Sequence, residues 1–217
     1  DDVNMSNSIL VGNTSSSQSA EVDIYIAGVK KGTFPIPANG TISRRFNGEI
    51  GGPVRVVSTN GVNVVASQKS VSGTGRSYSE VLGYPSDRFE TEYWFPLYDH
   101  GYPNVAGSNM CTWILVGNPS ATQTAEVDIY INGTLMDHYS IAPESNVTPR
   151  WVGTQAGPVR VVSTNGVPIF ASERVFTAPN SIFNEMMGYP LSQLVTEYWF
   201  PWYDSVNMGN QLLISKP

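Results

Sequence analysis

The chain has 217 residues, of which 41% are hydrophobic and only 14% are charged, so it can bury a core and is not intrinsically disordered. Its formal net charge is −6, and the lack of a basic surplus argues against a nucleic-acid partner. The apolar runs are far shorter than the roughly 20 residues of a membrane-spanning helix, so we expect no membrane insertion. Cys111 is the single cysteine, which excludes an internal disulfide and predicts a small buried side chain.

Two copies of one long repeat make up most of the chain. The segment ILVGN at residues 9–13 returns at 114–118, and PVRVVSTNGV at residues 53–62 returns at 158–167. The offset is 105 residues each time, which indicates an array of domains rather than a solenoid of small units. We predict three parts: a first repeat over residues 1–103, a second over 104–205, and an additional segment over 206–217.

The strands of each copy follow from alternation of apolar and polar residues. In residues 20–26, Val22, Ile24 and Ile26 alternate with polar side chains, which is typical of a half-buried strand. Asn60-Gly61 and Asn165-Gly166 are predicted to be two-residue hairpin tips between apolar runs. The remaining strands of the first copy are predicted at residues 8–11, 33–36, 41–46, 54–59, 62–67, 78–82 and 92–98.

This strand pattern predicts an all-β fold class. Seven or eight short strands in about 105 residues match the size of an immunoglobulin-like sandwich. Glycine and proline are frequent, with 20 and 15 residues, and they suit the many turns of such a fold. We therefore predict two tandem immunoglobulin-like β-sandwich repeats of about 105 residues each.

An aromatic run near the end of each copy is the most unusual feature. The segments TEYWFPLYD at residues 91–99 and TEYWFPWYD at 196–204 place bulky groups on both faces of a strand. One face can meet the home core, but the other needs a neighbouring repeat or a ligand. We predict inter-repeat packing, with sugar stacking as the alternative, for these residues: Tyr93, Trp94, Phe95, Tyr98, Tyr198, Trp199, Phe200, Trp202 and Tyr203.

No combination of residues predicts catalysis. His100 and His138 are the two histidines, and neither has a nucleophile motif nearby. Glu21 and Asp23, repeated in the second copy, share the outward face of one strand; a solvated face is the favoured interpretation and a glycosidase pair the alternative. We expect a non-enzymatic protein with no catalytic residue, no cofactor and no metal site.

The last residues predict contact with another molecule. Residues 207–214, NMGNQLLI, match residues 4–11, NMSNSILV, which form the opening strand of a repeat. An isolated strand leaves apolar side chains and unpaired backbone groups in water, so it recruits another sheet by main-chain pairing. Repetition of that contact gives a head-to-tail homopolymer or a longer array. The predicted inter-subunit strand residues are Asn210, Leu212, Leu213 and Ile214.

The motifs ILVGNPSATQTAEVDIYI, GPVRVVSTNG, NEMMGYP and TEYWFPWYD resemble tandem immunoglobulin-like repeats of long secreted or surface-anchored bacterial proteins. This class includes the stalk repeats of adhesins, surface-layer proteins and extracellular fibres, and the resemblance covers the whole chain. It implies a secreted, cell-surface location and a structural role in a stalk or filament. The alternative is a carbohydrate-binding or adhesive module of a larger secreted protein, with surface glycans as partners.

Overall fold

The computed structural model describes residues 5–73, 75, 77–177, 182–207 and 209–217. Its strands pair antiparallel throughout the described chain. The helical segments found there are two 3-10 turns, η1 (Ser86–Arg88) and η2 (Leu191–Gln193). No described helix has the length and apolar character that crossing a membrane requires. The predicted all-β class is confirmed.

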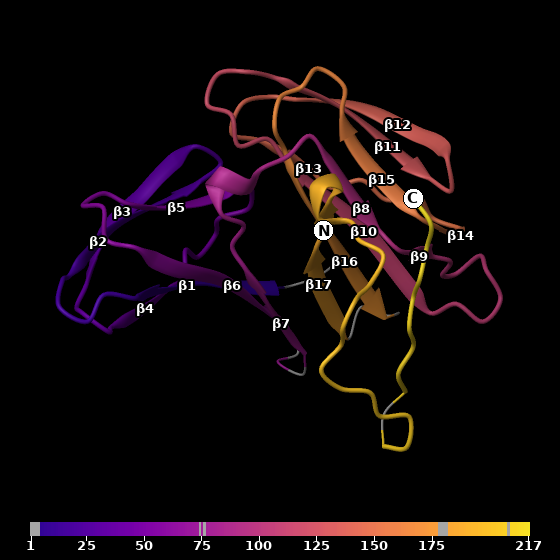
Figure 1. Ribbon diagram of the computed structural model, residues 1–217, viewed down its shortest axis with the longest axis horizontal. Helices are drawn as coiled ribbons and strands as arrows, with labels where there is room; N and C mark the ends of the chain where they lie inside the picture. The colour runs from indigo at the N-terminus through magenta and orange to yellow at the C-terminus, as the bar shows by residue number, and fades with distance from the viewer. Residues whose placement is uncertain (1–4, 74, 76, 178–181, 208) are drawn as a thin grey trace.

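The first half of the chain forms two sheets around one core (Figure 1). One sheet has the order β4 (Thr41–Arg44), β1 (Met5–Asn13), β6 (Val64–Ser72) and β7 (Tyr78–Leu82). The other has the order β3 (Val29–Ile36), β2 (Ala20–Ile26) and β5 (Val54–Ser58). Buried side chains of both sheets, among them Val11 from β1 and Ile24 from β2, belong to one hydrophobic cluster. Burial of these alternating apolar residues holds the two sheets together.

The second half repeats these seven strands and adds others. One sheet has the order β13 (Asn146–Val147), β10 (Met110–Gly117), β16 (Phe170–Thr177) and β17 (Phe183–Met187). The other has the order β12 (Thr134–Ile141), β11 (Ala125–Ile131), β15 (Val159–Ser163), β8 (Glu92–Phe95) and β18 (Tyr189–Pro190). A separate pair joins β14 (Thr154–Ala156) to β9 (Tyr98–His100).

The sheets do not follow the boundary expected after residue 103. Strands β8 and β9 come from the aromatic run of the first copy, yet both pair with strands of the second half. Residues 92–100 therefore belong structurally with the second half. The physical reason is edge pairing, because β8 covers a side of β15 that would otherwise present unpaired backbone groups.

The expected hairpins at Asn60-Gly61 and Asn165-Gly166 are wrong. Strands β5 and β6 lie in different sheets, as do β15 and β16, so each Asn-Gly pair connects two sheets. A two-residue hairpin of this kind needs a positive φ at both central residues. Gly61 has a φ of 76°, but the φ of Asn60 is not positive. The Asn60 side chain instead accepts from Glu21 N and donates to Ser19 O, at 3.1 and 2.8 Å, which ties the connection to the start of β2.

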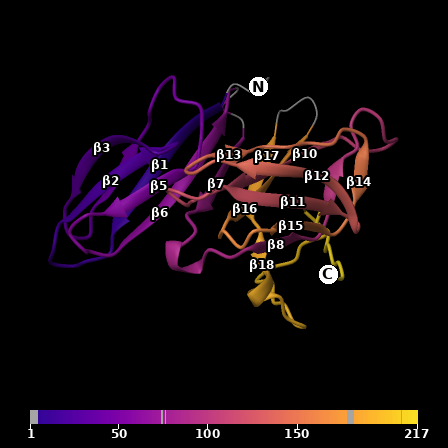
Figure 2. The same cartoon turned by 90° about the horizontal axis from the view of Figure 1, so that it is seen from above.

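The two halves touch along an edge, as Figure 2 shows from above. Strand β7 of the first half lies beside β17 of the second, and serine hydroxyls join them. Ser77 Oγ accepts from Phe183 N at 3.1 Å, and Ser79 Oγ accepts from Glu185 N at 3.1 Å. Side-chain oxygens thus satisfy backbone donors of β17 where no neighbouring strand pairs with it.

One buried asparagine in each half links the end of the opening strand to a loop. Asn118 is fully buried, and its Nδ2 donates to Gln123 O at 2.8 Å and to Ile141 O at 2.9 Å, while its Oδ1 accepts from Ser120 N at 2.9 Å. Asn13 makes the equivalent set of bonds in the first half. This side chain satisfies carbonyl groups that the interior hides from water.

Replacement of Asn118 by alanine should lower the free energy of unfolding by at least about 2 kcal/mol, because it leaves several buried backbone groups without partners. Urea denaturation followed by circular dichroism measures the change. Asn47→Ala is the control, since Asn47 is exposed and should give almost no change. Equal stability of the two variants would contradict this role of Asn118.

Candidate functional site

The candidate site is the part of the second half where β8 and β9 pair with its strands. Strand β8 lies antiparallel to β15, with Phe95 opposite Val159 and Tyr93 opposite Val161. A further backbone bond runs from Ser163 N to Thr91 O at 2.7 Å. On its other side, β8 pairs with β18 through Tyr189 and Pro190. The segment is therefore enclosed between two strands of the second half.

The core-facing side chains of this segment complete the second hydrophobic core. Tyr93, Phe95 and Tyr98 are at most 2% exposed and belong to the same cluster as Ile129 and Val161. Burial of such large aromatic groups removes much apolar surface from water, so this segment contributes strongly to the stability of the second half. The predicted packing residues Tyr93, Phe95 and Tyr98 thus lie inside the second half, at a contact between the two copies.

The opposite face of β8 carries a polar triad. Trp94 Nε1 donates to Glu92 Oε1 at 2.8 Å, and Arg160 donates to Glu92 Oε2 at 2.8 Å. The hydrogen bond from Arg160 holds the pKa of Glu92 below its ordinary value. Because Arg160 stands directly opposite Trp94 in the register, this triad favours one alignment of β8 on β15.

The hydroxyl of the fully buried Tyr98 has two backbone partners in the interior of the second half. It donates to Thr112 O at 3.0 Å and accepts from Trp151 N at 2.7 Å. The Trp151 ring also packs edge-on against Tyr98, with ring centroids 5.7 Å apart. Tyr98 thereby connects β9 to β10 and to the loop before β14. Sequence reasoning identified this tyrosine but had no way to identify its backbone partners.

The second aromatic run occupies a different environment. Residues 194–207 form no strand, and the large side chains of this run are exposed: Tyr198, Trp199, Phe200, Trp202 and Tyr203. Trp199 is 86% exposed and Trp202 is 74% exposed. The two copies of one motif are therefore in opposite states, buried in the first and solvated in the second. Several of these side chains line a hollow together with Asn210 and Leu212.

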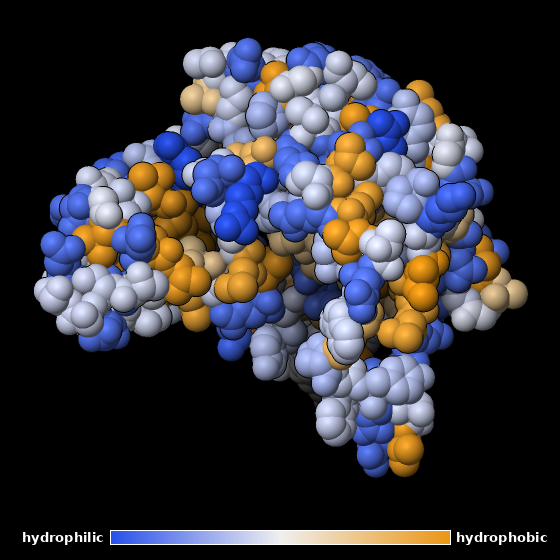
Figure 3. Space-filling model, in the orientation of Figure 1, coloured by the Kyte–Doolittle hydropathy of each residue, from blue (hydrophilic) through white to orange (hydrophobic). Residues whose placement is uncertain are grey.

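The predicted inter-subunit strand is also exposed. Residues 209–217 form no strand, and Leu212, Leu213 and Ile214 expose 59%, 50% and 91% of their surface. Asn210 is half-buried and donates to Asp204 O. In the match to residues 4–11, residues 4 and 208 lie outside the described chain. Figure 3 shows apolar surface on the front of the second half, where the C-terminal segment crosses it in Figure 1.

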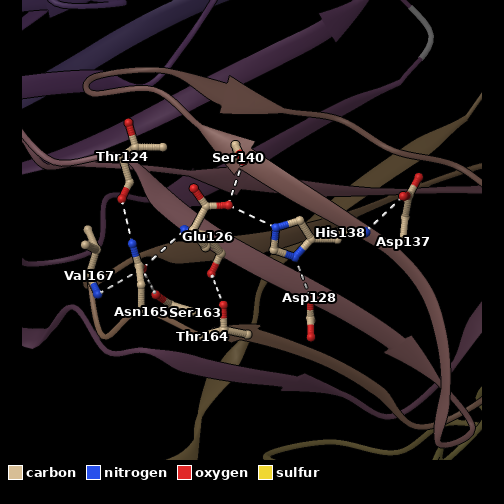
Figure 4. A network of polar contacts seen from close by, with 10 residues as sticks. All are labelled: Thr124, Glu126, Asp128, Asp137, His138, Ser140, Ser163, Thr164, Asn165 and Val167. Carbon is tan, nitrogen blue, oxygen red and sulfur yellow. Dashed lines mark hydrogen bonds and ion pairs between the residues drawn. The ribbon is translucent and has the colours of Figure 1, made fainter.

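The strand acids lie on an outward face and have local partners (Figure 4). In the second half, His138 lies between Asp128 Oδ1 and Glu126 Oε2, at 2.7 and 2.9 Å. The bond to Asp128, and then the one to Glu126, raises the pKa of His138. In the first half, Asp23 contacts Lys30 instead, at 2.7 Å. This geometry describes local charge pairing on the outward face of the strand, where the Asp23 side chain is only 9% exposed and that of Asp128 18%.

The other chemically notable residues also make structural contacts. His100 is buried, with Nδ1 2.9 Å from Thr112 O. Cys111 is only half-buried, contrary to the expectation of a buried side chain, because it alternates along β10 with the buried residues Thr112 and Ile114 and so lies on the other face of the strand. Burial nevertheless raises the pKa of its thiol. Within the described ranges, no group of three or more His, Cys, Asp or Glu side chains is arranged to hold a metal ion.

Glu173 is a buried acid that the sequence analysis did not identify. It lies on β16 and is 3% exposed. It is two residues after the core residue Ala171, so the two side chains lie on the same face of the strand. Burial raises the pKa of Glu173 to about 8. Its counterpart in the first half is the uncharged Gln68. The signal available in the sequence was the difference between the two copies at this position, where one has Gln and the other Glu.

Tyr98→Phe should lower the free energy of unfolding by about 1–3 kcal/mol, because Trp151 N then lacks its buried acceptor. Tyr203→Phe is the matched control, since Tyr203 occupies the same repeat position but is exposed. Urea denaturation of both variants measures the effect. A larger loss for Tyr203→Phe than for Tyr98→Phe would be inconsistent with these environments.

Glu173→Gln should make stability less dependent on pH. A carboxyl whose folded pKa is raised binds its proton more tightly in the folded state, so stability is lost as pH rises from about 5 to 8. The loss approaches about 1 kcal/mol per pH unit in that window. Unfolding free energies at pH 5 and pH 8 should differ more for the natural chain than for Glu173→Gln. Identical pH profiles would show that Glu173 ionises normally in the folded chain.

Comparisons with known proteins place few constraints on the chain. No protein-family model matches it, and no curated protein matches it either. Among solved structures, the Pleurotus ostreatus lectin in its apo form is 12% identical over 85% of this chain and 71% of its own, with a TM-score of 0.23. An anti-sigma factor domain-containing protein is 11% identical over 88% of this chain and 80% of its own, with a TM-score of 0.22. Similarity at this level supports no conclusion about fold or function.

Proposed function

We propose that this chain is a structural, non-enzymatic extracellular protein of immunoglobulin-like β-sandwich repeats that pack head to tail in a cell-surface stalk or filament. The proposal rests on the pairing of β8 and β9, which come from the first copy, with strands of the second half. A segment from the first copy supplies an interior strand and three core aromatics to the second half. A repeat that completes its neighbour in this way is suited to assembly in series.

The chemistry of the assembly follows from edge strands. The backbone of β15 obtains partners from β8, so the second half depends on a segment that precedes it in the chain. A contact of this kind joins unlike surfaces, the end of one repeat and the edge of the next. Heterologous contacts that do not close on themselves extend into open arrays. The expected partners are further copies of the same repeat.

The exposed aromatic run supports a second candidate function. Trp199, Trp202 and Tyr203 expose flat apolar rings beside the amide side chains of Asn210 and Gln211. Aromatic rings with nearby hydrogen-bonding groups suit stacking against sugars. The alternative proposal is therefore a carbohydrate-binding or adhesive module of a larger secreted protein.

Sedimentation velocity over a range of concentrations tests the structural proposal, with negative-stain electron microscopy of the same samples. We expect species longer than one chain that grow with concentration and form rows of particles. A glycan array with the natural chain and Trp199→Ala tests the alternative. A chain that stays monomeric and binds a sugar through Trp199 would contradict the structural role and support the adhesive one.

A further inference from the structure

The two halves differ at one edge. In the second half β15 is covered by β8, whereas its counterpart β5 is the last strand of its sheet. The difference extends into the core, because Val159 and Val161 of β15 are fully buried but their counterparts Val54 and Val56 are only half-buried. The first half thus has an acceptor edge on which no described strand pairs, comprising β5 and residues 49–53 before it. Loop residues of the second half lie against this edge, with Glu144 3.7 Å from Arg55 and Asn146 beside Gly52.

A cavity of about 190 Å³ lies beside this acceptor edge. Its lining includes Asn7, Phe46 and Val54 from the first half, and Val116 and Phe170 from the second. Asn7 and Phe46 are the counterparts of Thr112 and Trp151, whose backbone groups bind the Tyr98 hydroxyl. The cavity therefore lies where the first half would hold a tyrosine equivalent to Tyr98.

We propose that residues 196–204 of one copy of this chain insert as a strand along β5 of a second copy. This inference rests on the proposed head-to-tail function and names the segment and edge that carry it. Residues 196–204 and β5 are the counterparts, at an offset of 105 residues, of the β8 segment and of β15. The observed register of β8 on β15 therefore gives the expected register of residues 196–204 on β5. Phe200 lies opposite Val54, Trp199 opposite Arg55, and Tyr198 opposite Val56.

The side chains on both sides of this expected contact fit. Tyr198 and Phe200 bury themselves over Val54 and Val56, as Tyr93 and Phe95 do over β15. Tyr203 enters the cavity, where its hydroxyl meets Asn7 O and Phe46 N. All of these aromatic groups are exposed in the single chain, so docking removes apolar surface from water.

The charges fit as well. Arg55 stacks over the Tyr25 ring at 4.1 Å, much as Arg160 contacts Tyr130, and its nearest acid is Glu144 at 3.7 Å. Glu197 of the incoming segment is the counterpart of Glu92 and takes the place of Glu144 as the partner of Arg55. One contact is not reproduced, because Ile50 stands where Gln155 binds Asp99.

Phe200→Asp tests the assignment, since it introduces a charge at a position that becomes buried only on docking. Phe200 is 69% exposed in the single chain, so the variant should fold normally. Ile214→Asp is the matched control in the sequence-predicted strand 207–214, at a position 91% exposed. Sedimentation velocity should show assembly weakened at least about tenfold for Phe200→Asp and unchanged for Ile214→Asp.

A labelled peptide of residues 195–205 provides an independent test. It should bind the Phe200→Asp chain, whose acceptor edge is unchanged, with a rise in fluorescence anisotropy. The same peptide with Phe200→Asp should not bind. Assembly that survives Phe200→Asp, or is lost with Ile214→Asp, would overturn the strand assignment and leave head-to-tail assembly in place. If the natural chain stays monomeric and the peptide does not bind to the acceptor edge, both the strand assignment and the head-to-tail assembly are overturned.

Discussion

The need of an edge strand for backbone partners is the constraint on which the rest of this structure depends. The N–H and C=O groups along the free side of β15 find partners in β8, and the aromatic side chains of β8 and β9 then close the core beneath. Without that segment, the valines of β15 would be as exposed as those of β5. Backbone pairing and core closure are thus satisfied together by one stretch of chain.

The same segment couples the two halves mechanically. The chain leaves β7 of the first half, passes through η1 and becomes an interior strand of the second half. Aromatic contacts follow this path: Tyr84 packs edge-on against Tyr93, and Phe89 stacks on Phe170 with centroids 5.5 Å apart. Ser77 and Ser79 add hydrogen bonds between β7 and β17. Pulling the halves apart therefore requires breaking the backbone pairing of β8 with β15 as well as the contacts between the two surfaces.

The polar faces show how the two copies have diverged around a constant framework. Asp23 and Asp128 occupy the same strand position, but the first contacts Lys30 and the second contacts His138. Likewise Gln68 and Glu173 occupy the same strand position, one neutral at all pH values and the other with a raised pKa. These substitutions alter local charge and leave strand order unchanged.

The sequence by itself determined the all-β class, the 105-residue repeat and most strand positions, because alternation of apolar residues and turn residues are local properties. It also identified the aromatic runs as unusual. Only the tertiary structure decided that Asn60-Gly61 connects two sheets and that residues 92–100 belong with the second half. Two identical motifs, TEYWFP at residues 91–96 and 196–201, are buried in one place and exposed in the other. The reason is physical: a strand's environment is set by the edge it pairs with, and pairing between distant segments is not encoded in the local pattern of either one.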